Sequence, residues 1–579
     1  MIVGIDLGTT NSLVGVWTAD GAKLLEEGGD ALLPSVVALD PDGGVVVGRT
    51  ARNRRLVAPE RTVVSVKRLM GRSTEVELGE RRLSPPQISA LILGALLDRV
   101  EAELGERPDR AIITVPAYFD DIQRQATRDA GELAGLRVER LVNEPTAAAL
   151  GYDSGEEQLV LVYDLGGGTF DVSILEREAE LLEVLTSFGD TRLGGDDIDE
   201  ALCDLVLTRM GADGDVVRRD RLAKTRLLEL VERAKIALSS REETKLHDPF
   251  VTEGGVHIDL EITRDDLEAV AAPWIERTLA HVDQALRDAK IRPADLDRVL
   301  LVGGSSKMPL VARRLEEHLE LPTQRDLDAD TAVAVGAVML AGRADGRAVE
   351  QVLVDLTPHT LSAGTADDEW PMGEDQLLAS AVIPRNTVVP AERKRTFYTA
   401  HDEQEGVEFP ICQGEGERVG DNTYLGVLNL GGLPPSPAGS PVEVTFRLDL
   451  SGVLNVTVLH VSSGRQGEAR ISQTPYRLTA RQRREAQQEV AELRLVKRGQ
   501  DEAAPAGASS PSPGEVERAK AMLKSSERAI ERAKAGGTEA SAISAAERAR
   551  SALSVAVEAS SADLSQPIEA LTDALLDLL

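Results

Sequence analysis

Residues 2–10 read IVGIDLGTT, and residues 161–169 read LVYDLGGGT. Each stretch is an apolar run that ends in Asp-Leu-Gly and continues into small residues and a second strand-like run. This pattern predicts a buried strand, a tight turn and a returning strand. The simplest account of two such stretches is a pair of related lobes that face each other.

The two turns have the chemistry of a phosphate-binding loop. Glycine has no Cβ to hold an anion away from backbone N–H groups, and threonine adds hydroxyl donors. Asp6 and Asp164, at the strand ends, suit a magnesium ion that bridges phosphates and keeps several waters. A single glycine-rich turn is more often structural than functional. The turn residues in question are Gly8, Thr9, Thr10, Gly166, Gly167, Gly168 and Thr169.

A third stretch, VLLVGGSSKMP at residues 299–309, is again a strand pattern that runs into paired glycines. Its Gly303, Gly304 and Ser305 could hold the nucleoside. Turn chemistry alone does not explain three such segments in this order, so the sequence predicts ATP binding.

The rest of the chain divides by composition. Strand and helix patterns alternate up to about residue 347, which predicts an α/β domain over 1–347. Residues 348–356 are a short apolar linker, and 357–474 contain short strands separated by Gly, Pro and Asn turns, as in a β domain. Residues 475–579 are helical, with a flexible Pro/Ser/Gly/Ala stretch near 501–514.

Charge and cysteine content exclude several classes of protein. The chain has 97 acidic and 65 basic side chains, a formal charge of −32, which argues against binding nucleic acid or anionic membranes. No run of apolar residues is long enough for a membrane span, and no signal peptide is visible. The 2 cysteines, Cys203 and Cys412, lie far apart in the sequence. A reduced, cytoplasmic location therefore fits best.

Several motifs together resemble the actin, hexokinase and heat-shock chaperone superfamily, and within it the seventy-kilodalton heat-shock (Hsp70) chaperones of the bacterial DnaK type. They are GIDLGTTNS (4–12), VKRL (66–69), VPAYF (115–119), NEPTAAA (143–149), YDLGGGTFD (163–171), LGGDD (193–197) and VGGSSKMP (302–309). The resemblance implies a two-lobed actin-like ATPase domain, a β-sandwich peptide-binding domain and an α-helical lid or tail.

The resemblance assigns roles in hydrolysis and magnesium binding to five residues. It implies that Lys67 reaches the γ-phosphate and the attacking water, with Glu144 near that water. Thr169 would contact the γ-phosphate, and Asp164 would organise magnesium together with Asp6. Phosphoryl transfer depends on positioning and charge stabilisation, so these assignments are physically reasonable and imply slow turnover of ATP to ADP.

The resemblance also implies nucleotide contacts by Asn11, Glu232, Lys235, Ser239 and Asp330. Spacings of three, four and seven place the middle three on one helical face. The alternative for Glu232 and Lys235 is a solvated ion pair within the helix. For Asp330 the alternative is a capping residue at a loop end.

Five residues match positions that couple the domains of Hsp70 chaperones. Pro116 and Arg124 resemble a proline switch and its partner, although Pro116 could simply terminate a strand. Arg140, Asn143 and Asp355 match positions that receive a J-domain co-chaperone, although each could be an ordinary surface group. A nucleotide exchange factor is a further implied partner.

The linker and the β domain would complete a chaperone cycle. A short apolar linker is costly to expose and can be buried as an added strand, so residues 352–354 could report nucleotide state to the β domain. Phe397, Ala400, Val407 and Phe409 match positions that line a groove for unfolded or apolar client peptides. The alternative is that these side chains form the core of the β domain.

Some features depart from the family pattern. The segment over residues 362–382 is unusually long, Ala363 and Ala366 stand where larger residues commonly shape the groove, and His359 replaces an aliphatic residue, where packing is the expected role. The helical tail could be a lid or a docking helix for a partner. A sugar or metabolite kinase, an actin-like filament protein and a chaperone dedicated to one client are the alternatives to a general chaperone.

Overall fold

The computed structural model describes residues 1–40, 42–152, 158–248, 251–252, 255–324, 329–347, 351–366, 376–469 and 480–502. It also describes residues 520, 523, 526–527, 530, 534, 540–558 and 571. The chain forms two compact units, residues 1–497 and residues 498–579. None of the described helices is both long and apolar enough to span a membrane.

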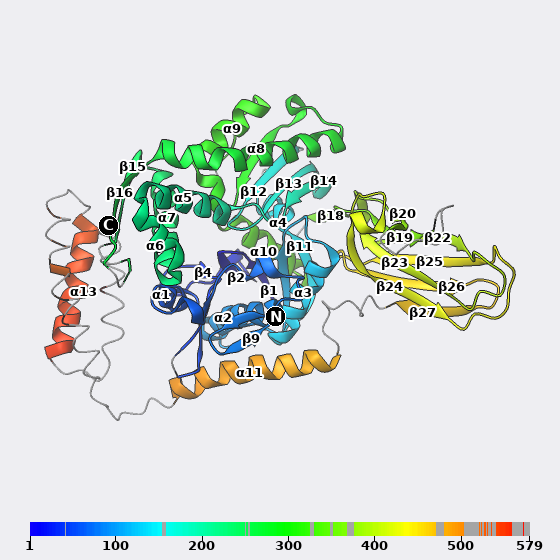
Figure 1. Ribbon diagram of the computed structural model, residues 1–579, viewed down its shortest axis with the longest axis horizontal. Coiled ribbons are helices and arrows are strands. Elements are labelled where there is room, and N and C mark those ends of the chain that lie inside the picture. Colours follow the sequence, from blue (N-terminus) through cyan, green and yellow to red (C-terminus); the bar gives the residue numbers. More distant parts are fainter. Residues whose placement is uncertain are drawn as a thin grey trace. The chain divides into compact units, whose positions relative to one another are not determined.

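The first lobe is built on a mixed sheet with helices packed against it (Figure 1). β1 (Ile2–Leu7) pairs in parallel with β10 and antiparallel with β2. Its apolar side chains are buried on both faces, because helices cover the sheet. The remaining elements of this sheet and its helices are β2 (Asn11–Thr18), β3 (Gly21–Leu24), β4 (Leu33–Pro34), β10 (Arg110–Val115), β11 (Arg137–Asn143), α2 (Pro85–Leu104), α3 (Asp121–Leu133), α4 (Glu144–Gly151) and α10 (Ala332–Ala344).

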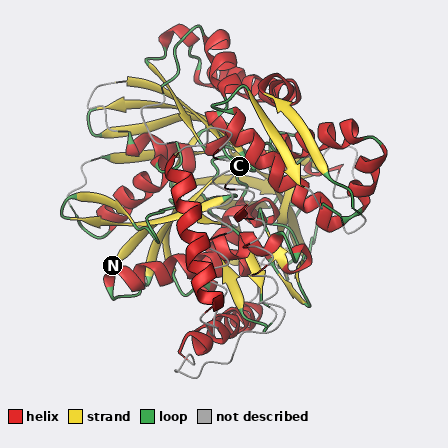
Figure 2. Ribbon diagram, turned by 90° about the vertical axis from the view of Figure 1, so that its left-hand side faces the viewer, coloured by secondary structure: helices red, strands yellow, loops and turns green. Residues whose placement is uncertain are grey.

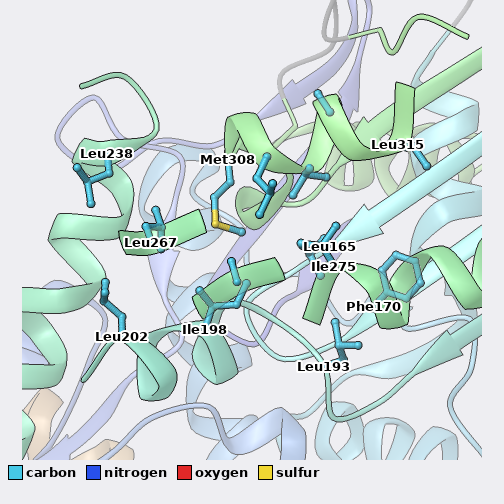
Figure 3. Packing of buried hydrophobic residues seen from close by; sticks show 14 of the residues in the cluster. Leu165, Phe170, Leu193, Ile198, Leu202, Leu238, Leu267, Ile275, Met308 and Leu315 are labelled. Carbon is cyan, nitrogen blue, oxygen red and sulfur yellow. The ribbon is translucent and has the colours of Figure 1, made fainter. Parts of the chain in front are cut away.

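The second lobe has a sheet of order β17-β12-β13-β14-β18-β21. Its largest core lies between this sheet and its helices, where Leu165, Phe170 and Leu193 converge with helix residues (Figure 3). Strands flanked by helices are also visible in the turned view (Figure 2). The elements are β12 (Gln158–Leu165), β13 (Phe170–Glu178), β14 (Leu181–Asp190), β17 (Arg298–Val302), β18 (Val352–Thr357), β21 (Thr387–Val389), α5 (Gly195–Met210), α7 (Arg221–Leu238), α8 (Arg264–Ala289) and α9 (Pro309–Leu319).

Residues 361–366 and 376–469 form what we call the two-sheet region. Two four-stranded antiparallel sheets, β20-β19-β23-β24 and β22-β25-β26-β27, enclose a shared core. Alternate residues of the strands point inward, as along β26, where Leu454, Val456 and Val458 are buried. The strands are β19 (Leu361–Thr365), β20 (Leu378–Ile383), β22 (Ala391–Tyr398), β23 (Gly406–Gln413), β24 (Thr423–Gly431), β25 (Pro441–Leu448), β26 (Leu454–His460) and β27 (Arg465–Ala469).

Helix α11 (Ala480–Glu502) packs on the first lobe. Val490 and Leu493 are 1% exposed and belong to the core of that lobe. Arg494 lies directly over Gly94 of α2, where an added Cβ would lie 2.7 Å from the guanidinium. In the second compact unit the structure describes α13 (Ala540–Glu558). Most of the expected flexible stretch, from residue 503 onward, lies outside the described residues.

Candidate functional site

A cavity of about 380 Å³ lies between the two lobes. All three glycine-containing turns contribute to its wall, together with α7. Sequence-predicted residues that line it are Asp6, Gly8, Thr9, Thr10, Asn11, Lys67, Glu144, Asp164, Gly166, Gly167, Thr169, Glu232, Lys235, Ser239, Gly303, Gly304, Ser305 and Asp330. Gly168 alone of the predicted cavity residues is not in the wall.

Glycine is required in these turns because backbone and side chains approach closely. At Gly303, φ is +82°, and an added Cβ would lie 2.6 Å from Oδ1 of Asp164. At Gly168, an added Cβ would lie 2.7 Å from Cγ2 of Thr9. Gly168 therefore allows the turns of the two lobes to meet, although it does not face the cavity.

The inner end of the cavity holds an ion pair between Lys67 and Glu144. Lys67 lies in a short 3-10 helix, and Glu144 is the first residue of α4, so the pair joins two parts of the first lobe. The two residues are 4% and 8% exposed. The Thr114 hydroxyl, which the sequence did not single out, donates to Oδ1 of Asp6 at 2.6 Å.

Four buried carboxyl groups surround the single ammonium of Lys67. Burial raises the pKa of Asp6, of Glu144 and, most strongly, of Asp164, and nearby carboxylates add to the effect at Glu144 and Asp164. Burial also raises the pKa of Asp171 to about 7. The excess of acidic groups favours an added cation at this end of the cavity.

The acidic groups fit magnesium better than a metal held by protein ligands alone. Among the described residues, no group of three or more His, Cys, Asp or Glu side chains could hold a metal ion. Magnesium commonly takes one or two carboxylates and completes its shell with water and substrate phosphates. Asp6 and Asp164 both line the cavity and meet that requirement.

Helix α7 and Ser239, the residue that caps it, form the outer end of the cavity. Lys235 binds Asp199 at 2.7 Å, and Glu232 binds Arg52 of the first lobe at 2.6 Å. The alternative of an ion pair between Glu232 and Lys235 is therefore wrong. Lys235 also donates to the carbonyl of Gly195 at 3.1 Å, which fixes its position.

Ile236 is a cavity residue that the sequence reasoning missed. Its side chain is 60% exposed and lines the cavity beside Ser239. An exposed aliphatic group at this place offers a flat apolar surface to a nucleobase. The sequence held a hint of this position, because Ile236 directly follows Lys235, a predicted nucleotide contact, in the helix. Asp330, which also lines the cavity, forms an ion pair with Lys307.

The apolar linker forms strand β18, which is added to the second-lobe sheet. Val352, Leu353 and Val354 pair in parallel with residues 181–183 of β14. The Val352 amide donates to the carbonyl of Glu180 at 2.7 Å. The strand continues to Thr357, one residue beyond the expected linker, and residues 348–350 lie outside the described part of the chain.

Asp355 ends this linker in a buried polar network. The Asn143 amide donates to both Asp355 oxygens, at 2.9 and 3.0 Å, and Arg124 donates to Oδ1 of Asn143 at 2.7 Å. Arg124 also donates to the carbonyl of Ser451 in the two-sheet region at 3.4 Å. Arg140 contributes electrostatically, since its charge opposes the rise in the pKa of Asp355 that burial causes. The structure thus joins four of the five predicted coupling residues.

Pro116, the fifth, follows β10 and is buried two residues before Tyr118. The Tyr118 amide donates to Oδ1 of Asp171 at 3.0 Å. The Tyr118 carbonyl lies 3.0 Å from Nε2 of His359, and the two rings are 4.1 Å apart. His359 therefore contacts the first lobe next to a residue that reaches the inner carboxyl cluster, a contact that the sequence could not reveal.

The predicted groove residues divide into two groups. Val407 and Phe409 are each 7% exposed and belong to the core of the two-sheet region. Phe397 is partly buried, with its ring 5.0 Å from that of Phe409. Ala400 is exposed in the loop after β22. The arrangement allows Phe397 and Ala400 to meet a ligand, while Val407 and Phe409 support them from the core.

Comparison with known proteins agrees with this site. The family model described as "Hsp70 protein" matches residues 2–78 and 73–578. The "Chaperone protein DnaK" of Halobacterium salinarum is 43% identical over 472 residues, which cover 80% of this chain and 73% of that relative. These matches favour neither a sugar kinase nor an actin-like filament protein. The chain belongs to the Hsp70 family.

Proposed function

We propose that this chain binds and releases exposed apolar segments of unfolded proteins, and that ATP hydrolysis changes its affinity for them through the linker. Membership of the Hsp70 family and the similarity to a DnaK chaperone support ATP-dependent chaperone function and ATPase activity. The observation that carries the proposed coupling is the linker strand β18, which adds to the second-lobe sheet and ends in the Asp355 network.

Hydrolysis would take place at the inner end of the cavity. Lys67 is positioned by Glu144 and can stabilise charge that develops on the γ-phosphate. Thr169 and the backbone of the glycine turns can bind phosphate oxygens. Glu144 can accept a hydrogen bond from an attacking water. No covalent intermediate is needed, so slow turnover governed by positioning is expected.

We propose that magnesium accompanies the nucleotide. Asp6 and Asp164 are the residues that would hold it, and it would neutralise phosphate charge when bound. Thr114 keeps Asp6 oriented in the cavity wall by donating to Oδ1. The raised pKa of Asp164 means that a bound cation should favour its ionised form.

The two-sheet region would be the peptide-binding β-sandwich. Phe397 and Ala400 would contact an extended apolar client, supported by Val407 and Phe409. Arg395 lies over the Phe397 ring, 5.6 Å from its centroid, and could influence which residues flank the bound segment. The helical tail would act as a lid, with α11 held against the first lobe in the arrangement described.

A J-domain co-chaperone and a nucleotide exchange factor are the proposed partners. Asn143 and Asp355 are only 3% and 5% exposed, whereas Arg140 is half-buried and more accessible. We therefore expect Arg140 to contact the J-domain and the buried pair to transmit its effect. We also propose a cytoplasmic location, in keeping with the two free, buried cysteines.

Steady-state ATP hydrolysis tests the proposed function. The purified protein is assayed alone, with an unfolded apolar peptide and with a J-domain protein. We expect slow turnover that both partners accelerate, and loss of turnover in Lys67→Ala. Lys245→Ala, which removes an exposed lysine that does not line the cavity, is the matched control and should behave as wild type. Turnover that ignores both partners would contradict the proposal.

A further inference from the structure

A second cavity, of about 470 Å³, adjoins the nucleotide cavity between the lobes. Both cavities share Thr9, Thr10, Arg52 and Glu232 in their walls. Arginines from both lobes line the second cavity, and we call it the arginine cleft. Its arginines are Arg52, Arg55, Arg68, Arg72 and Arg192.

The shape of the nucleotide cavity creates a problem for product release. Lys67, Glu144 and Asp164, at the inner end, are 4%, 8% and 6% exposed. Ile236, at the nucleoside end, is 60% exposed and therefore lies at the mouth. While ADP remains bound, its nucleoside lies between the mouth and a phosphate ion produced at the inner end. That ion needs another way out.

Two closely packed turns and the side chain of Arg68 separate the inner end from the arginine cleft. The first-lobe turn with Thr9 and Thr10 touches the second-lobe turn with Gly167 and Gly168. An added Cβ at Gly167 would lie 2.0 Å from Oγ1 of Thr10. An added Cβ at Gly168 would lie 2.8 Å from Cγ and Cδ of Arg68, so a slight separation of the turns together with a shift of this flexible side chain would join the two cavities.

The charges of the cleft favour a departing anion. Each acidic residue in its wall already has a basic partner. These pairs are Asp196 with Arg68, Asp199 with Lys235, Glu200 with Lys224, Glu229 with Arg55, and Glu232 with Arg52. Within the described part of the chain, Arg72 and Arg192 have no acidic partner, and both are exposed at the cleft. The cleft therefore carries unpaired positive charge at its outer side.

We propose that inorganic phosphate leaves through the arginine cleft while ADP stays in the nucleotide cavity. Thr9 and Thr10 would pass the ion from the inner end to the cleft, and Arg72 and Arg192 would attract it outward. This route rests on the proposed ATPase function and adds a second opening to that site. Because the two arginines act on the route and not on the bound state, they should change the rates of phosphate uptake and release alike.

The test compares the double variant Arg72→Glu/Arg192→Glu with wild type and with Arg241→Glu. Arg241 is an exposed arginine of the second lobe that lines neither cavity. A single turnover of bound ATP is followed by acid quench for total phosphate and by a fluorescent phosphate sensor for free phosphate. Phosphate uptake is measured on protein loaded with a fluorescent ADP analogue. Inorganic phosphate is added, and the rate at which it begins to slow the release of the analogue is recorded.

We expect the double variant to hydrolyse ATP at the wild-type rate, which also shows that it is folded. Phosphate release and uptake should both slow by roughly five-fold, a screened-charge estimate, with phosphate affinity and ADP release in the absence of phosphate unchanged. Arg241→Glu should match wild type. Phosphate uptake by the double variant at the wild-type rate would overturn the exit route. So would a changed phosphate affinity without equal changes in the rates of uptake and release. Absence of hydrolysis in the wild type would instead overturn the proposed function.

Discussion

Asp355→Ala should detach the linker from the second-lobe sheet. The substitution removes an acceptor of two N–H bonds from Asn143, at 2.9 and 3.0 Å, and leaves that buried amide without its partner. A hydrogen bond to a charged group contributes about 1.5–3 kcal/mol and an orphaned buried donor costs about 1–3 kcal/mol, so about 3 kcal/mol is a reasonable sum for the docked state. That energy corresponds to roughly a hundred-fold shift towards the undocked linker.

Hydrogen exchange of the linker amides in the presence of ATP measures this shift. The Val352 amide, which donates to the carbonyl of Glu180, should be protected in wild type and should exchange up to roughly a hundred-fold faster in the variant. Asp295→Ala, at an exposed acid of the second lobe, is the matched control and should leave exchange unchanged. Basal hydrolysis should survive in both variants, but stimulation by a client peptide should be lost only in Asp355→Ala. Wild-type protection in Asp355→Ala would refute the reasoning.

Three further substitutions test other parts of the structure. Gly303→Ala should abolish ATP binding in a filter assay, because φ is +82° and the new Cβ would lie 2.5 Å from a carbonyl oxygen. The control Gly105→Ala, at a glycine with open space around it, should bind ATP normally. Val490→Ala with Leu493→Ala should speed hydrogen exchange in α11, since truncating a buried leucine costs about 2–5 kcal/mol. Burial and nearby arginines lower the pKa of His359, so its protonation favours the separated state. Docking of the two-sheet region on the first lobe, followed by hydrogen exchange, should therefore weaken as pH falls through about 6.5, the ordinary pKa of histidine. His359→Gln should remove this dependence on pH.

The part of the cavity that we propose binds phosphate could be predicted because its signals are local. Asp6 and Gly8, like Asp164 and Gly166, are neighbours in sequence, and the need for glycine in the turn is visible without the fold. The helical spacing of Glu232, Lys235 and Ser239 is local as well.

Other features could not be read from the sequence because they depend on contacts between distant segments. Thr114 orients Asp6 only because β10 lies beside β1. Asp199 competes successfully with Glu232 for Lys235 because α5 and α7 pack together. The docking of α11 on the first lobe also follows from tertiary packing, and a helical pattern alone could not distinguish a lid from a partner's docking helix.

The central claim is that nucleotide state controls client binding through the linker. The most direct test is the dissociation rate of a fluorescent apolar peptide, measured with ATP and with ADP for wild type and for Asp355→Ala. The account predicts that ATP speeds dissociation from the wild type at least ten-fold and that Asp355→Ala loses most of this difference. Equal dissociation rates with ATP and ADP in the wild type would contradict it.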